Sequence, residues 1–194
     1  MTWNHPPWIC LGNGADHLLE LIFRGFLDPQ DKVVYPSPTY SLYGILAQLE
    51  AAQSVVLDYL PNHELPIEDI LNSQGKLTLI AAPASPTGQA ISIAALVTLA
   101  ESHQGVLVID EAYCDFAEEN ALSLISHHAN IILVRTLSKG YSLAGVRLGY
   151  AIAHPDLIAV INKVKDSYSV DAIALQLGIA AIQDQAYKNE KSLK

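Results

Sequence analysis

Basic residues and cysteines are scarce in this sequence. Eleven lysines and arginines stand against 20 aspartates and glutamates, which gives a formal net charge of −9 at pH 7. A protein that binds nucleic acid needs basic patches to neutralise phosphates, so we expect no nucleic acid partner. The two cysteines, Cys10 and Cys114, do not make a disulfide framework. Their small number favours a reducing, cytoplasmic environment.

Long apolar runs are also absent. The run IAALVTLA at 93–100 is among the longest, and it falls well short of the roughly 20 residues that a membrane-spanning helix needs. We therefore expect no membrane partner. The chain does not open with the charged, apolar and small-residue pattern of a leader, so no signal peptide is predicted.

The signatures of several other site classes are missing. The seven histidines show no metal-ligand spacing, so we expect no metal site. The chain has neither a Walker A loop nor a GxSxG nucleophile motif. GNGAD at 12–16 nearly matches a dinucleotide fingerprint, but His17 stands where the third glycine belongs and no clear strand is predicted before it. A nicotinamide cofactor is therefore disfavoured.

Apolar residues, by contrast, are abundant and regularly placed. The 194 residues are 51% hydrophobic, which is enough for one domain with a sizeable core. Short apolar runs alternate with segments of helical periodicity, whereas 187–194 is polar and lacks periodicity. Strands are expected at 32–36, 54–59, 77–83, 106–110, 131–137 and 146–153, and helices at 17–27, 40–52, 92–103, 155–166 and about 171–185. This alternation predicts an α/β fold with a mostly parallel sheet covered on both faces.

Polar residues gather just after the expected strands. In such sheets a ligand binds outside the carboxyl ends of the strands. Asp110 and Tyr113 follow the strand at 106–110, and Ser138 and Lys139 follow the strand at 131–137. GNGAD opens a helix, and helix N-termini hold anions. We expect Asp110 and Lys139 to face a common cleft.

The loop after the strand expected at 131–137 places a lysine and an arginine close together among small residues. A lysine that forms a Schiff base must be partly neutral, and nearby cations and desolvation favour that state. Arg147 and the hydroxyl of Ser138 could clamp a phosphate, together with backbone N–H groups of GNGAD. Asp110 could hold a protonated ring nitrogen. A pyridoxal phosphate (PLP) site needs these parts.

Five motifs occur in the order and spacing of a known family: GNGAD (12–16), YPSPTYSLY (35–43), PTG (86–88), VIDEAY (108–113) and RTLSKGYSLAGVRLGY (135–150). On these motifs the chain resembles the fold-type I PLP enzymes, and among them the histidinol-phosphate aminotransferase-like group. The resemblance implies a three-layer α/β domain with about seven strands. It extends over nearly all of 1–194, which we identify as a PLP-binding large domain without the family's N-terminal segment and C-terminal small domain.

The resemblance also implies a role for each site residue around the cofactor ring. Lys139 is expected to be the Schiff-base lysine and the acid and base of the proton shift. Asp110 would pair with the pyridinium nitrogen, Tyr113 would donate to the phenolic oxygen, and Tyr40 would stack on the ring. Ser85 lies in the cofactor site where the family usually has asparagine.

The same resemblance assigns the phosphate and the overall reaction. Ser138, Arg147 and the backbone at Ala15 and Asp16 are expected to hold the phosphate. The implied activity is cytoplasmic amino transfer, in amino-acid biosynthesis, between histidinol phosphate or a related amine and 2-oxoglutarate. The family's cleft lies at a dimer interface, so a homodimer is expected.

Other interpretations remain open at this stage. A PLP-dependent decarboxylase of the threonine-phosphate type would use the same scaffold, and a truncated, inactive PLP-binding remnant would keep the same motifs. Singly, Lys139 could be a surface lysine, Asp110 a helix cap and Arg147 a structural ion-pair partner, while Tyr40 and Tyr113 could simply pack. The family's Pro-Tyr-Asn is also replaced, by residues 167–169, Ser-Tyr-Ser.

Overall fold

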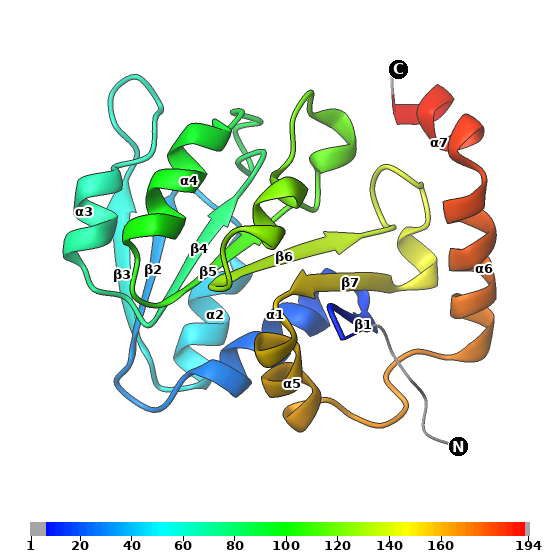
Figure 1. The fold of residues 1–194 in the computed structure, drawn as a ribbon, viewed down its shortest axis with the longest axis horizontal. Coiled ribbons are helices and arrows are strands. Elements are labelled where there is room, and N and C mark those ends of the chain that lie inside the picture. Colours follow the sequence, from blue (N-terminus) through cyan, green and yellow to red (C-terminus); the bar gives the residue numbers. More distant parts are fainter. Residues whose placement is uncertain (1–6, 193–194) are drawn as a thin grey trace.

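A computed structural model describes residues 7–192 and shows a three-layer α/β fold (Figure 1). The described strands form one seven-stranded sheet in the order β1-β7-β6-β5-β4-β2-β3. Strands β2 to β6 run parallel, and β7 is antiparallel to both of its neighbours, β1 and β6. The strands are β1 (Ile9–Asn13), β2 (Lys32–Ser37), β3 (Gln53–Asp58), β4 (Leu77–Ala81), β5 (Val106–Asp110), β6 (Ile131–Thr136) and β7 (Leu148–Ala153). The predicted fold class is confirmed.

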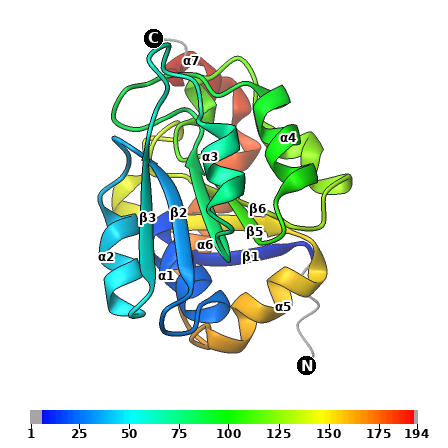
Figure 2. The ribbon, with the colours of Figure 1, turned by 90° about the vertical axis from the view of Figure 1, so that its left-hand side faces the viewer.

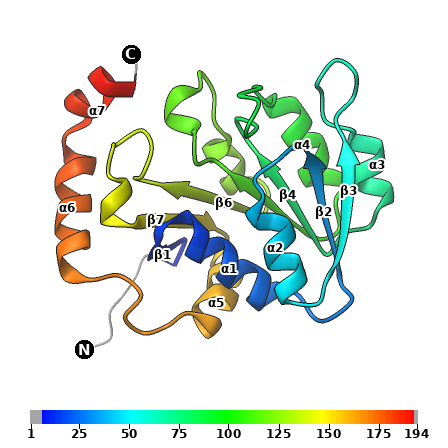
Figure 3. The same cartoon turned by 180° about the vertical axis from the view of Figure 1, so that it is seen from behind.

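Helices cover both faces of this sheet. One layer holds α1 (Gly14–Phe26), α2 (Leu42–Leu49) and α5 (Pro155–Val164), and the other holds α3 (Ile67–Asn72) and α4 (Ile93–Ser102) (Figure 2). Two further helices, α6 (Ala172–Gln183) and α7 (Gln185–Ser192), stand at the β7 end of the molecule (Figure 3). Three short 3-10 helices complete the described elements: η1 (Cys114–Phe116), η2 (Ala121–Ser126) and η3 (Ala144–Val146).

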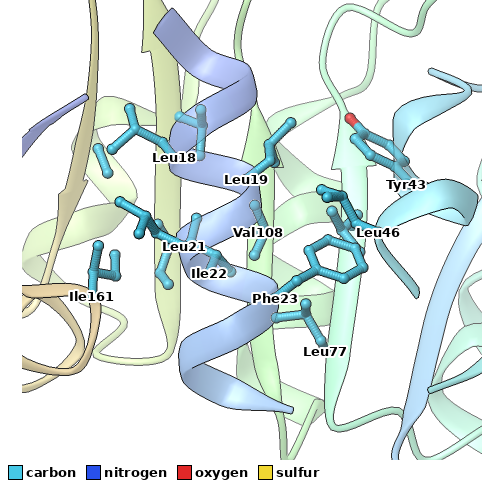
Figure 4. Packing of buried hydrophobic residues seen from close by; sticks show 14 of the residues in the cluster. Leu18, Leu19, Leu21, Ile22, Phe23, Tyr43, Leu46, Leu77, Val108 and Ile161 are labelled. Atoms are coloured by element: carbon cyan, nitrogen blue, oxygen red, sulfur yellow. The ribbon is translucent and has the colours of Figure 1, made fainter. Parts of the chain in front are cut away.

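The apolar strands supply two separate cores. Successive side chains of a strand point to opposite faces, so on β5 Val108 packs into the core under α1, while Leu107 and Ile109 pack into the core under α4. The α1 core includes Leu18 and Phe23, both fully buried (Figure 4). Burial on both faces explains why these strands read as continuous apolar runs rather than alternating ones.

One strand and two α-helices were not predicted. β1 contradicts the expectation that no strand precedes GNGAD; it is a half-buried edge strand, so its apolar signal is weak. The dinucleotide-binding fold is still not formed, because β1 pairs only with antiparallel β7 and is no neighbour of β2. The short α3 was also missed. α7 falls where no helix was expected, because it is held by polar contacts rather than an apolar face.

The α1 N-terminus packs closely against β7 at Gly149. A Cβ there would lie 2.6 Å from the carbonyl carbon of Gly14 and 2.7 Å from the amide nitrogen of Ala15. Both of these atoms belong to the backbone, so neither can move away through a change of rotamer as a side-chain atom could. Glycine at 149 is therefore required for the observed position of the first turn of α1.

Gly149→Ala should destabilise the fold by about 1–3 kcal/mol, the usual cost of overpacking. Gly145→Ala is the matched control, because a Cβ at Gly145 meets no atom within 4 Å. Urea denaturation of both variants measures the difference. Equal stability of the two variants would contradict the close packing of α1 against β7.

Candidate functional site

A cavity of about 210 Å³ opens at the carboxyl ends of β4, β5 and β6, beside the N-terminus of α1. Every site residue proposed from the sequence lines it: Ala15, Asp16, Tyr40, Ser85, Asp110, Tyr113, Ser138, Lys139 and Arg147. Asp110 and Lys139 thus share one cleft, as expected. The structure brings the residues together, while their individual roles stay predictions.

Asp110 is the buried charge of the cavity. Asp110 is the last residue of β5 and is only 6% exposed. One carboxylate oxygen, Oδ2, accepts a hydrogen bond from the Tyr43 hydroxyl at 2.8 Å, and Oδ1 accepts one from the amide of Ala112 at 3.1 Å. The bond to Ala112 is a local turn contact, and the next helical element, η1 (Cys114–Phe116), has Tyr113 rather than Asp110 at its N-cap.

The carboxyl of Asp110 has no cationic partner among residues 7–192. Burial raises its pKa, while the hydrogen bonds from Tyr43 and Ala112 act in the opposite direction. A buried carboxylate is costly unless a positive charge compensates it. The site therefore fits a ligand that brings a cationic N–H group to Asp110.

Lys139 lies on the loop after β6 and is exposed. Its Nζ is 5.2 Å from the centre of the Tyr113 ring, which is itself 38% exposed and lines the same cavity. A primary amine in this position can reach a carbonyl of a ligand bound in the cavity.

The N-terminus of α1 forms a second, anion-binding part of the site. No side chain caps this helix, so its first N–H groups face the cavity edge at Ala15 and Asp16. Gly14 has φ +80°, and a Cβ there would lie 2.5 Å from the Nη2 atom of Arg147. Glycine at 14 thus allows the guanidinium to approach the helix N-terminus, and the donor set fits a phosphate.

Arg147 reaches this position from a left-handed backbone conformation, with φ +54°. Such conformations are uncommon for non-glycine residues and cluster at functional sites. Its Nη1 donates to the Ser138 hydroxyl at 3.4 Å and to the Ala144 carbonyl at 3.2 Å, and its Nη2 lies 3.5 Å from Oδ2 of Asp16. Arg147 therefore forms an ion pair with Asp16 in the cavity wall, while a structural role for that pair stays a prediction.

Tyr40 closes the cavity on the α2 side. Its hydroxyl donates to Oδ1 of Asp16 at 3.2 Å. Burial raises the pKa of Tyr40, and the negative charge of Asp16 raises it further. The ring meets that of Tyr43 edge to face, with centroids 5.9 Å apart. This contact holds the Tyr40 ring at the mouth of the cavity.

A buried ion pair connects the ends of β5 and β6. Arg135 Nη2 lies 2.6 Å from Oε2 of Glu111, and the two side chains are 14% and 1% exposed. Burial lowers the pKa of Arg135, but the charge and hydrogen bond of Glu111, together with nearby Cys114 and Tyr150, raise that pKa overall. The pair joins Arg135 on β6, before Lys139, to Glu111, the residue after Asp110. The second oxygen of Glu111 also accepts a hydrogen bond from the Ala121 amide.

Sequence reasoning missed Tyr43, Thr136 and Arg135 as contributors to the site. Tyr43 lies one helical turn after Tyr40 in PTYSLYG, a spacing that could have indicated a shared face. Thr136 lines the cavity and its Oγ1 accepts from the amide of Ser138 at 3.1 Å. A threonine on a buried strand carries no such signal in the sequence.

The two departures from the family pattern lie in different places. Ser85 lines the cavity, whereas Ser169 lies on the segment between α5 and α6, where its hydroxyl accepts from Nζ of Lys165 at 3.1 Å. Within residues 7–192, no group of three or more histidine, cysteine, aspartate or glutamate side chains could hold a metal ion. Nor does that part of the chain contain a helix long and apolar enough to cross a membrane.

The fold and the cavity define an α/β protein with a lysine, a buried aspartate and an anion cradle at the carboxyl ends of its strands. The family model of aminotransferase class I and II matches residues 4–194. The chain belongs to the aminotransferase class I and II family.

Individual proteins resemble the chain over most of its length. It is 51% identical over 182 residues to histidinol-phosphate aminotransferase 1 of Nostoc sp.. The alignment covers 94% of this chain and 52% of that protein. It is 40% identical over 183 residues to histidinol-phosphate aminotransferase of Geobacter sulfurreducens, covering 94% and 52%. The chain thus spans about half the length of the curated relatives it matches.

Solved structures agree with this assignment. The histidinol-phosphate aminotransferase from Sinorhizobium meliloti, crystallised in complex with pyridoxal-5'-phosphate, superposes with a TM-score of 0.91 at 30% identity. The match covers 97% of this chain and 54% of that one. The enzyme of the same name from Clostridium acetobutylicum superposes with a TM-score of 0.87 at 25% identity, covering 95% and 57%.

Asp110→Asn should stabilise the ligand-free chain at neutral pH. Above the ordinary carboxyl value near 3.9, the unfolded chain releases its proton while the folded chain, with its raised pKa, still holds it. Stability is therefore lost as pH rises toward that raised value, and the amide removes the loss. Melting temperature should increase by roughly 2–4 °C for each kcal/mol recovered.

The higher melting temperature of Asp110→Asn should disappear below about pH 4, where the Asp110 carboxyl is neutral in both the folded and the unfolded chain. Asp58→Asn, at an exposed position, provides the control. Thermal melts at several pH values measure the effect. A variant that melts lower than wild type at pH 7 would show that Asp110 is adequately compensated without a ligand.

Proposed function

We propose that this chain binds pyridoxal 5'-phosphate in the cavity between β4, β5, β6 and α1. The observation that carries the proposal is the buried carboxylate of Asp110, which lacks a cation in the described structure and shares its cavity with Lys139. The Sinorhizobium meliloti neighbour, which is in complex with this cofactor, supports the proposal. When bound, the cofactor supplies an electron sink that stabilises negative charge next to the amino group.

The chain's own residues would divide the work between two ends of the cavity. Asp110 would accept the protonated ring nitrogen, and Tyr43 would keep that carboxylate oriented. At the other end Ser138, Arg147 and the first N–H groups of α1 would hold the phosphate. Lys139 would bind the aldehyde carbon and later carry a proton from one carbon to another.

Tyr113, Tyr40 and Ser85 would surround the ring. Tyr113 would donate a hydrogen bond to the phenolic oxygen, and Tyr40, held by Asp16 and by the edge of Tyr43, would cover one face. A serine hydroxyl reaches less far than the asparagine amide that the family usually has, so Ser85 would support the phenolic oxygen more weakly. Residues 1–194 would form the large, cofactor-binding domain of the protein.

The proposed reaction is amino transfer between histidinol phosphate, or a related phosphorylated amine, and a 2-oxo acid such as 2-oxoglutarate. Its support is the identity of 51% and 40% to relatives named histidinol-phosphate aminotransferase. The decarboxylase and inactive-remnant hypotheses are not favoured, because those relatives are named as aminotransferases. We place this proposed reaction in amino-acid biosynthesis in the cytoplasm.

Addition of PLP to the purified chain should produce a visible absorbance band and a cofactor adduct that borohydride makes permanent. Lys139→Ala should abolish the permanent adduct, because no amine remains in reach of the aldehyde carbon. Lys165→Ala is the control, since Lys165 bonds Ser169 away from the cavity. Mass spectrometry of tryptic peptides locates the adduct. An adduct on any other lysine would sink the proposed site.

The amino-transfer step has its own readout. Formation of glutamate from 2-oxoglutarate should depend on both histidinol phosphate and Lys139. Release of carbon dioxide from a phosphorylated amino acid without glutamate formation would instead identify a decarboxylase. Binding of PLP with neither product would favour the inactive remnant.

A homodimer is also proposed. α6 is apolar on nearly all sides, and Ile173, Leu177, Ile179 and Ile182 are 74%, 46%, 50% and 49% exposed. Exposed apolar surface of this extent marks an interaction site. Sedimentation should show a dimer that Ile173→Lys and Ile182→Lys weaken. A monomer at high concentration would refute the pairing.

A further inference from the structure

α7 packs against the loop that carries Lys139. An ion pair also joins α7 to η1: Nζ of Lys188 lies 2.8 Å from Oδ1 of Asp115. The side chains are only 14% and 17% exposed. By comparison, the Lys76 and Asp28 side chains of another pair are 45% and 84% exposed. Shielding from water makes an ion pair stronger and the loss of one partner more costly.

Asp115 also touches the residue that follows Lys139. A Cβ built on Gly140 would collide with Cβ, Cγ and Oδ2 of Asp115, and Gly140 is buried. Glycine at this position lets the carboxylate lie directly against the backbone of the loop. Movement of Asp115 is therefore transmitted to the backbone next to Lys139.

Tyr141 provides the direct contacts between α7 and the loop. Nζ of Lys188 lies 5.8 Å from the centre of the Tyr141 ring, a cation–π arrangement. Nε2 of Gln185 donates to the Tyr141 hydroxyl at 3.1 Å. Two residues of α7, Gln185 and Lys188, thus contact Tyr141, the second residue after Lys139.

Asp115 belongs to η1, two positions after Tyr113, which also lines the cofactor cavity. Through Asp115 and its contact with Gly140, the Lys188–Asp115 pair therefore joins three segments: α7, the loop at 137–143 and η1. Lys139 Nζ and the Tyr113 ring, which face each other at 5.2 Å, come from the two segments that this pair holds together.

We propose that Lys188 and Asp115 are positioning residues that fix Lys139 and Tyr113 relative to each other. Neither residue lines the cofactor cavity, and both act through Gly140 and the η1 backbone. Order in the loop is a property of the chain alone. The consequence for cofactor binding rests on the proposed function, so the two are measured separately.

The first measurement is amide hydrogen exchange of the chain without cofactor. Lys188→Met should speed exchange at 137–143 and at 113–116 by roughly tenfold or more, since local opening frees both segments. Lys191→Met is the matched control: it makes the same change on the same helix, at a side chain that is 42% exposed and lies 3.5 Å from Glu190. Asp115→Asn should reproduce the effect of Lys188→Met.

The second measurement is the affinity for PLP. Lys188→Met and Asp115→Asn should each weaken binding by roughly tenfold, and the double variant should be no weaker than either single one, because both remove the same interaction. Lys188→Arg should retain most of the affinity, which a general loss of stability would not explain.

Equal exchange and equal affinity for Lys188→Met and Lys191→Met would overturn the proposal, as would additive losses in the double variant. Faster exchange in a chain that fails to bind PLP at all would support the positioning contact and refute the cofactor site instead. If Lys188→Met does not fold, the exchange rates and PLP affinities of Asp115→Asn and Lys188→Arg are compared with those of Lys191→Met instead.

Discussion

The burial of the Asp110 carboxylate is the constraint on which the site depends. Asp110 ends the central strand β5, and its two oxygens accept hydrogen bonds from Tyr43 on α2 and from the Ala112 amide. No basic side chain of residues 7–192 neutralises it, although the strong Arg135–Glu111 pair lies one residue away. The fold thus places a carboxylate without a basic partner in a cavity. A cationic ligand offsets the free-energy cost of burying that charge.

The sheet topology supplies the rest of the site around that charge. Parallel strands β4 to β6 bring their carboxyl ends to one edge, while β1, paired with antiparallel β7, aims the N-terminus of α1 at the same edge. The cavity therefore has a carboxylate at one end and an anion cradle at the other, with Lys139 between the strand ends. A ligand with a basic ring and a phosphate satisfies both ends at once.

Much of this arrangement could be predicted from the sequence, because strands buried on both faces leave continuous apolar runs and the residues after them must meet at one sheet edge. Asp110, Tyr113, Ser138 and Lys139 lie in the cavity for that reason, whereas Ala15, Asp16 and Arg147 do not follow such a strand. The edge strand β1 and the polar α7 were missed, since neither buries an apolar face of its own. Tyr43 was missed because a tyrosine in an apolar helix is expected to serve only core packing. The structure shows that this buried side chain donates its hydroxyl to Asp110.

The most direct test of this account is the protonation state of the cofactor's ring nitrogen in the bound chain. The ¹⁵N chemical shift of ring-labelled PLP reports it at neutral pH. A protonated nitrogen in wild type and a neutral one in Asp110→Asn is the predicted result, because only a buried carboxylate would hold the extra proton there. A neutral nitrogen in wild type, or the same shift in both proteins, would contradict the role of Asp110 and with it the account of the site.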